Sequence, residues 1–187
     1  MITQLLKLVL GMSLAGGITL SAATSTLLVL DSSHSMSGNE MHMKKTIRDN
    51  LKNGVEIVGF GSYWYNINKA DDYHLNGSTA LGKILKAVND DKNSNFEYVI
   101  LTTDGYPDDV ELVKKQARIL KDSGSKICST FIAPPNTPIP QILKDISSAV
   151  FLSDAKNPVA KCQGSMQRQI LGHTAIQKTI DVNQFAF

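Results

Sequence analysis

A carboxylate and two hydroxyls stand at alternate positions early in the sequence, at Asp31, Ser33 and Ser35. They follow the unbroken apolar run of residues 27–30, which is typical of a parallel strand buried on both faces. A strand that ends in this way brings only hard oxygen ligands into one turn. Such ligands suit Mg²⁺, Mn²⁺ or Ca²⁺ and suit zinc or copper poorly. The stretch therefore predicts a site for a hard divalent cation.

Other apolar runs predict the strands that would share a sheet with residues 27–30. These runs are short, and polar residues, glycine or proline separate them. Residues 63–67 begin with three consecutive aromatic residues, whose side chains would point to alternate sides of an edge strand. The remaining predicted strands cover residues 55–60, 98–101, 127–132 and 149–152.

Helical spacing of apolar residues separates the predicted strands, with one apolar face on each helix. Ser78 and Thr79 are both typical caps for the helix that follows them. Asp108 and Asp109 precede another helix, and we expect them in its first turn, where the helix dipole favours carboxylates. The predicted helices cover residues 39–52, 81–88 and 109–121, with a short one around residues 142–146.

Strands that alternate with helices imply right-handed crossovers and a mostly parallel sheet between two helical layers. We therefore expect an α/β chain with a three-layer α/β/α, doubly wound architecture. In such sheets ligands bind beyond the carboxyl ends of the strands, near the topological switch point. Asp31 follows the strand at residues 27–30, and Asp104 follows the strand at residues 98–101. The rule thus places both carboxylates on the same rim of the sheet.

The sequence resembles von Willebrand factor A domains in three separate loops. Asp31, Ser33 and Ser35 match the Asp-x-Ser-x-Ser motif, which builds the metal-ion-dependent adhesion site of that family. Thr79, in Gly-Ser-Thr-Ala before a predicted helix, fits the second metal-site loop, and Asp104, in Leu-Thr-Thr-Asp-Gly after a predicted strand, fits the third. The resemblance implies the Rossmann-like fold of the family and a metal site made of these five residues. Thr79 then serves the metal, which leaves the serine before it as the helix cap.

The resemblance also implies how such a site works. Ser33, Ser35 and Thr79 would bind the cation directly or through water, and Asp31 and Asp104 would act mostly through bridging waters. A cation that is not neutralised by direct carboxylate ligands stays electrophilic and accepts a carboxylate from outside. The resemblance therefore implies a module for adhesion or assembly that binds an Asp or Glu of a partner protein, and not an enzyme.

Two other functions stay open on the sequence alone. A regulatory or structural subunit of a larger complex, as in intracellular members of the family, would keep the same fold. A hydrolase would need Ser33 or Ser35 as nucleophile, His34 or His74 as base and Asp104 to orient that base. The sequence has no Gly-x-Ser-x-Gly elbow, and Ser33 stands where a phosphatase-like Asp-x-Asp pair would have its second aspartate. We therefore do not expect catalysis.

Length and charge describe one ordinary domain with two appendages. The chain has 187 residues, of which 42% are hydrophobic and 19% charged, enough for a sizeable core at residues 24–153. The net charge of +2 is too small to indicate a nucleic-acid partner, and the clustered basic residues fall on predicted helices. Residues 154–187 form a C-terminal extension that could fold onto the domain.

The first 23 residues have the form of a secretory signal peptide. Lys7 gives a weakly basic start, residues 8–20 are apolar, and Ser21, Ala22 and Ala23 make a small-residue stretch. We expect export to the periplasm, the cell surface or the medium, with membrane contact only through an uncleaved leader.

Two cysteines, Cys128 and Cys162, agree with export. An even number in an exported chain permits one disulfide. Cys128 falls in a predicted core strand, where a buried free thiol is equally common. Paired and unpaired cysteines are both compatible with the sequence.

Overall fold

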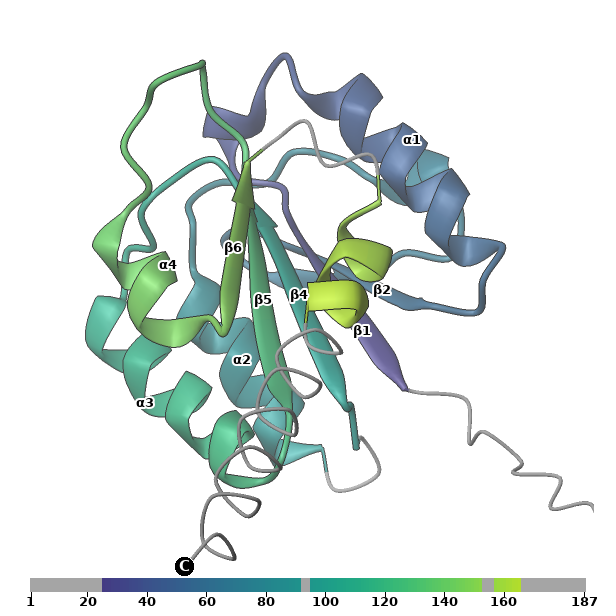
Figure 1. Cartoon of the computed structure of the whole chain (residues 1–187). Helices are drawn as coiled ribbons and strands as arrows, with labels where there is room; N and C mark the ends of the chain where they lie inside the picture. Colours follow the sequence, from purple (N-terminus) through teal and green to yellow (C-terminus); the bar gives the residue numbers. More distant parts are fainter. Residues whose placement is uncertain (1–24, 92–94, 153–156, 166–187) are drawn as a thin grey trace, which may run out of the picture.

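The computed structural model describes residues 25–91, 95–152 and 157–165. The described residues form a six-stranded sheet in the order β3-β2-β1-β4-β5-β6, covered by helices on both faces (Figure 1). All neighbouring strands are parallel except β3, which runs antiparallel to β2 at one edge. The strands are β1 (Thr26–Asp31), β2 (Glu56–Phe60), β3 (Trp64–Asn66), β4 (Tyr98–Thr103), β5 (Lys126–Phe131) and β6 (Ala149–Leu152).

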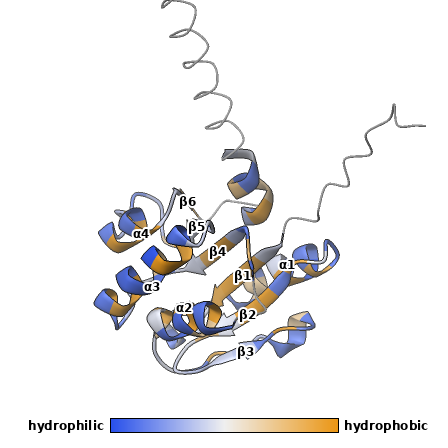
Figure 2. Cartoon of the chain, turned by 90° about the horizontal axis from the view of Figure 1, so that it is seen from below, coloured by the Kyte–Doolittle hydropathy of each residue, from blue (hydrophilic) through white to orange (hydrophobic). Residues whose placement is uncertain are grey.

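The helices divide between the two faces and enclose two apolar cores. One face carries α2, α3 and α4, and the other carries α1 together with the helical residues 158–165. Figure 2 shows the hydrophobic strands between helices whose outer surfaces are hydrophilic. The predicted three-layer α/β/α fold is therefore confirmed. The helices are α1 (Glu40–Leu51), α2 (Leu81–Asp90), α3 (Val110–Asp122) and α4 (Gln141–Ile146), with short 3-10 turns η1 (His34–Met36) and η2 (Ala70–Asp72).

The strand order places a crevice at the carboxyl end of β1. The chain leaves β1 toward β2 on one side, whereas β4 lies on the other side of β1. This is the switch point at which open α/β sheets bind ligands. Residues 27–30 are at most 1% exposed, which explains why this strand is apolar without alternation. The carboxylates that follow β1 and β4 therefore emerge at adjacent strand ends.

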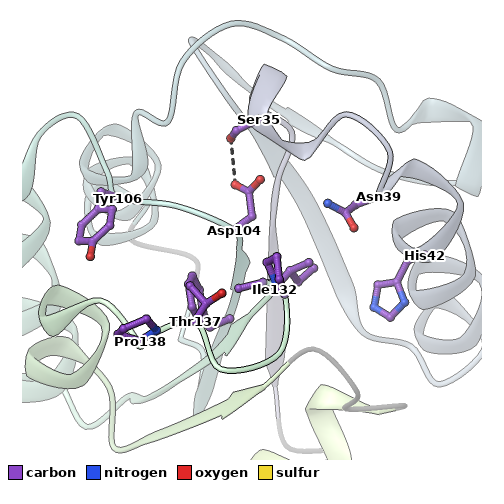
Figure 3. A pocket seen from close by; sticks show the side chains of 11 residues that line it. Ser35, Asn39, His42, Asp104, Tyr106, Ile132, Thr137 and Pro138 are labelled. Carbon is purple, nitrogen blue, oxygen red and sulfur yellow. Dashed lines mark hydrogen bonds between the residues drawn. The ribbon is translucent and has the colours of Figure 1, made fainter.

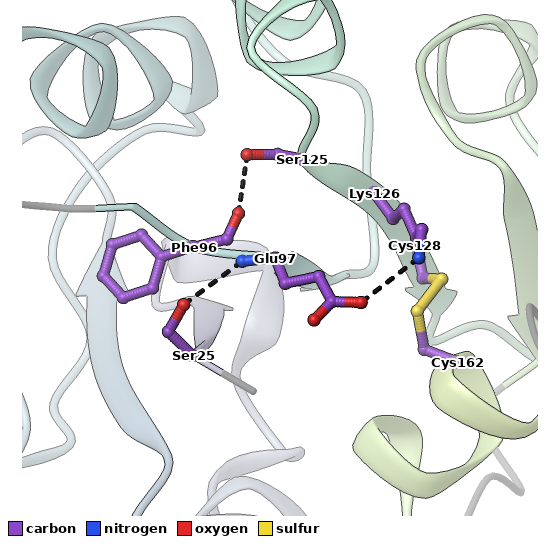
Figure 4. A network of polar contacts seen from close by, with 7 residues as sticks. All are labelled: Ser25, Phe96, Glu97, Ser125, Lys126, Cys128 and Cys162. Atoms are coloured by element: carbon purple, nitrogen blue, oxygen red, sulfur yellow. Dashed lines mark hydrogen bonds and ion pairs between the residues drawn. A yellow bond between two sulfur atoms is a disulfide. The ribbon is translucent and has the colours of Figure 1, made fainter. Parts of the chain in front are cut away.

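A disulfide joins β5 to the helical residues 158–165. Cys128 and Cys162 are both fully buried, with their Cα atoms 6.0 Å apart (Figure 4). Figure 4 also shows the amino ends of the strands, where Lys126 contacts the Glu97 carboxylate at 3.2 Å. Val159 and Cys162 lie in the core on the α1 face, so the described part of the predicted C-terminal extension packs on the sheet.

Some predictions fall outside the described residues. The predicted signal peptide at residues 1–23 is one, and residues 166–187 of the extension are another. Within residues 25–91, 95–152 and 157–165, no helix is both long and apolar enough to span a bilayer.

Candidate metal site

The turn after β1 is built around the Asp31 carboxylate. Asp31 is fully buried, and its Oδ1 accepts a hydrogen bond from the Ser33 backbone N–H at 2.8 Å. An aspartate that binds the amide two residues ahead folds the chain into a tight turn. The Thr103 hydroxyl at the end of β4 donates to the other carboxylate oxygen at 2.6 Å, and the Tyr73 hydroxyl donates to the Asp31 backbone carbonyl at 2.7 Å. Asp31 therefore ties the first loop to the neighbouring strand.

Two serine hydroxyls continue from this turn to the second carboxylate. The Ser33 and Ser35 hydroxyl oxygens are 2.8 Å apart and share a hydrogen bond. Ser35 donates to Asp104 Oδ1 at 2.9 Å, a bond that joins the loops after β1 and β4 (Figure 3). Asp31 and Ser33 are buried, whereas Ser35 is exposed and Asp104 half-buried. The four residues thus form a hydrogen-bonded series that runs from the interior to the surface.

Thr79 lies on a third loop that touches the other two. The His34 backbone N–H donates to the Gly77 carbonyl at 2.9 Å, which fixes this loop beside the two serines. The Thr79 N–H donates to Asp108 Oδ2 at 3.1 Å, and the Asp108 N–H donates to the Thr79 carbonyl at 3.1 Å. Among the described residues no hydrogen bond joins the Thr79 hydroxyl to the other four side chains. Its place in the site rests on these backbone contacts.

The predicted side-chain caps of α2 and α3 do not form. Ala80, and not Ser78, occupies the N-cap position of α2, and it makes no side-chain bond. Asp109 occupies the N-cap position of α3, but its side chain makes no capping bond. Its Oδ1 accepts from the Gly82 N–H of α2 at 3.1 Å instead. A Cβ at Gly82 would lie 2.6 Å from Asp109 Oδ2, so only glycine leaves room for this carboxylate. Asp108 likewise serves the neighbouring loop, because the two helix starts lie side by side.

The electrostatics of the site favour a cation. Burial raises the pKa of the Asp31 carboxyl above its usual value of 3.8, and hydrogen bonds from Thr103 and Ser33 offset part of that effect. The nearby charge of Asp104 raises the pKa of Asp31 further. Ser33 and Ser35 link the two carboxylates, whose charges repel each other. A divalent cation placed between them would remove this repulsion, which is a smaller effect on Asp31 than its burial.

The ligand atoms available here fit a divalent cation that prefers oxygen. Among the described residues no three His, Cys, Asp or Glu side chains gather closely enough to hold a metal, so any ion here depends on hydroxyls. Both oxygens of Asp31 already accept a hydrogen bond, although a carboxylate oxygen has a second lone pair. Ser33, Ser35 and Asp104 present oxygens nearer the surface. Asp31 is suited to supply negative charge from behind them.

The residues that a hydrolase would need are engaged elsewhere or exposed. His34 is solvent-exposed. The His74 ring stacks on Tyr65, with ring centroids 4.3 Å apart. Its Nε2 lies 3.1 Å from the Tyr63 hydroxyl and its Nδ1 lies 2.8 Å from the Asp72 carbonyl. Both nitrogens of His74 therefore have partners, and neither is placed to activate a serine of the site.

Comparison with known proteins finds matches among solved structures. No known family profile and no curated protein matches the sequence. Proximal thread matrix protein 1 from the mussel byssus matches with a TM-score of 0.55 at 17% identity, over 77% of this chain and 44% of the mussel chain. The same protein with a zinc-occupied MIDAS motif gives a TM-score of 0.56 at 16% identity, over 75% and 44% of the two chains.

A parasite protein matches over a larger share of its own length. Manganese-loaded TRAP protein of Plasmodium vivax gives a TM-score of 0.52 at 18% identity, over 72% of this chain and 71% of that chain. This chain spans less than half of the mussel chains. At these identities the likeness is one of fold.

Proposed function

We propose that this chain, which has the von Willebrand factor A fold of these neighbours, is a protein-binding module that depends on a divalent cation. The observation that carries the proposal is the hydrogen-bonded series of Asp31, Ser33, Ser35 and Asp104 at the carboxyl ends of β1 and β4. It brings two carboxylates and two hydroxyls to the switch point of the sheet, with its outer end open to solvent.

Each residue of the site would have a distinct role. Ser33, Ser35 and Thr79 would hold the cation, and Asp31 and Asp104 would balance its charge mostly through water. When bound, the cation supplies a Lewis acid that takes a carboxylate oxygen from an Asp or Glu of the partner protein. The buried Asp31 keeps the serine turn in place, since the Ser33 amide donates to it.

The choice of cation is broad. The ligand atoms suit Mg²⁺, Mn²⁺ or Ca²⁺. The zinc-occupied MIDAS motif of the mussel neighbour and the manganese-loaded parasite neighbour support a divalent cation in this chain. They also add zinc to the ions that a titration has to include.

The location that fits this function is outside the cytoplasm. The Cys128–Cys162 disulfide is the kind of bond that persists in oxidising compartments. A neighbour from the mussel byssus, an extracellular material, supports the same location. Both observations favour an exported adhesion or assembly module over an intracellular subunit of a larger complex.

Metal binding is tested by calorimetric titration of the full chain with Mg²⁺, Mn²⁺, Ca²⁺ and Zn²⁺. Asp104→Ala should abolish binding of the ion that the wild type takes. Asp71→Ala is the matched control, because Asp71 is 83% exposed and its nearest cationic partner, Lys44, is 3.8 Å away. Equal binding by the wild type and Asp104→Ala would contradict the proposed site.

Carboxylate recognition is tested with a displayed library of random peptides that is bound in the preferred cation and eluted with EDTA. Enriched peptides should contain Asp or Glu and should lose binding when that residue becomes Asn or Gln. Peptides that stay bound in EDTA would refute a bridge through the metal.

A further inference from the structure

A cavity of about 690 Å³ opens directly beside the candidate metal site (Figure 3). Ser35 and Asp104 belong to both, so the metal site forms one wall of the cavity. Its volume lies within the range of pockets that take small ligands or single side chains, about 300–1,000 Å³. A residue bound at the cation would therefore have its sequence neighbour over this cavity.

The opposite side of the cavity is apolar and stiff. It comes from the segment after β5, with Ile132, Pro134 and Pro138 among its lining residues. Proline fixes its own φ angle, so this side loses little conformational freedom when a ligand binds. Such a surface suits an apolar group that is removed from water on binding.

Aromatic and polar groups form the rim. Tyr106 is 67% exposed, and its ring stands at the edge of the cavity (Figure 3). Exposed tyrosine rings contribute strongly to interfaces once a partner covers them. Asn39 stands at the N-cap of α1, yet its side chain makes no capping bond and points toward the cavity (Figure 3). Its amide has both donors and an acceptor for the backbone of an extended peptide.

The charges of the cavity argue for a neutral occupant. None of its lining residues is lysine or arginine, and Asp104 is the one carboxylate among them. In the proposed function the charge of Asp104 is engaged by the cation, and His42 is the remaining charged or titratable group on the α1 side. The cavity thus has no lysine or arginine to pair with an acidic side chain and, once Asp104 is engaged, no carboxylate to pair with a basic one.

We propose that this cavity binds a large aromatic side chain that lies next to the metal-bound acidic residue of the partner. The inference rests on the proposed function and adds a specificity to it. The recognised element is a short extended segment in which Phe, Tyr or Trp stands within two positions of Asp or Glu. The cation binds the Asp or Glu side chain, and the cavity favours those Asp or Glu residues that have an aromatic neighbour.

The displayed library separates this inference from the proposed function. After elution with EDTA, the enriched peptides should carry an aromatic residue within two positions of the acid. One such peptide, fluorescently labelled, is then titrated against the full chain, together with a second peptide in which the aromatic residue is alanine. The first peptide should bind at least about tenfold more tightly, the usual effect of a buried aromatic anchor.

Two variants locate the aromatic residue in the cavity. Thr137→Trp fills the cavity from an exposed lining position, and Tyr106→Ala removes its rim. Both should lower affinity for the aromatic peptide about tenfold and leave affinity for the alanine peptide and for the cation unchanged. Lys115→Trp is the matched control, because it places the same ring on the exposed side of α3.

The other outcomes overturn the inference. Peptides enriched for an acid without an aromatic neighbour would refute it and leave the proposed function standing. The same holds if Thr137→Trp binds each of the two peptides with the affinity of the wild type. Binding that persists in EDTA would refute both proposals together.

Discussion

The Cys128–Cys162 disulfide gives the prediction with the best-defined magnitude. It fastens the helical residues 158–165 to β5, and it closes a loop with a sequence separation of 34 residues. The perturbation is the double substitution Cys128→Ala with Cys162→Ala. Alanine is preferred to serine because both positions are fully buried, and a hydroxyl without a partner there costs about 1–3 kcal/mol.

The size of the effect follows from loop closure in the unfolded chain. For a closed loop of 34 residues, the chain-entropy relation gives about 3.8 kcal/mol of stabilisation at 25 °C. The two missing sulfur atoms add a smaller loss, because the core around them cannot fully collapse. We expect the free energy of unfolding to fall by about 3–5 kcal/mol in total. The loop-closure part alone lowers Tm by about 8–15 °C for a chain of this size.

Urea unfolding of the full chain, followed by circular dichroism, measures this loss. A reducing agent should bring the wild type close to the stability of the double variant and should leave the double variant unchanged. Calorimetric titration with the preferred cation should give the same affinity for both proteins. Cys128 pairs with Ile100 and Ala149 along the sheet, three residues before the end of β5, whereas the candidate metal site lies at the ends of β1 and β4.

Two results would refute this reasoning. A loss below about 1 kcal/mol would mean that the disulfide does not restrict the unfolded chain as the loop length requires. A loss of cation binding in the double variant would mean that residues 158–165 support the site, although every described contact of the site comes from elsewhere in the chain.

Three further predictions concern the candidate site and the loops beside it. At a hundred times its Kd, the cation should stabilise the wild type by about 2.7 kcal/mol, which is seen as a rise in Tm. Asp31→Asn should abolish this rise. In EDTA the variant should have an equal or higher Tm, because a buried charge is lost, and a lower Tm would contradict this. The pKa of Asp31 is raised in the folded state, so the folded protein binds the proton of this carboxyl more tightly than the unfolded chain does. The free energy of unfolding in EDTA should therefore decrease as pH rises from 3.8 through the raised pKa. Asp31→Asn should lack that decrease, which urea unfolding at several pH values would detect, and a slope shared by both proteins would assign it to another group. Gly61→Ala should destabilise the chain by about 2 kcal/mol or more, because its Cβ would lie 1.8 Å from the Asn76 carbonyl oxygen, whereas Gly105→Ala, with open space around it, should be nearly neutral in the same thermal unfolding experiment.

The sequence was sufficient for those parts of the fold that local pattern determines. Each predicted strand and helix is present within a few residues of its predicted place, because apolar periodicity reports directly which face is buried. The short aromatic stretch at residues 64–66 is an edge strand as expected, and Gly59 behind it makes room for the Tyr65 ring. These features need no knowledge of distant residues.

The parts that were wrong or missed depend on contacts between distant segments. Asp109 was predicted to lie in the first turn of its own helix, but its carboxylate accepts a hydrogen bond from the Gly82 N–H at the start of α2. Thr103 was not predicted to support Asp31, because that bond requires the register of β4 against β1. Tyr73 lies 42 residues from Asp31 in a polar connection, and no local pattern marks it as a partner of that residue.

The site is held together by bonds that need no cation. Ser32, between Asp31 and Ser33, donates from its backbone N–H to the Phe60 carbonyl at 2.7 Å, and its own carbonyl accepts from the Asn76 N–H at 2.6 Å. The Asn76 side chain adds a bond to the Ser32 hydroxyl at 3.0 Å. These contacts align the loops after β1 and β2 with the loop that carries Thr79, before any ion arrives.

A preformed site has a direct consequence for affinity. Binding free energy that is not needed to order the loops remains available for the ion and its ligand. In the cation-free protein, burial is the main cause that raises the pKa of Asp31, and the nearby charge of Asp104 adds a smaller part. A cation at the proposed site would offset both effects, so we expect Asp31, the most deeply buried of the five predicted site residues, to be needed for cation binding.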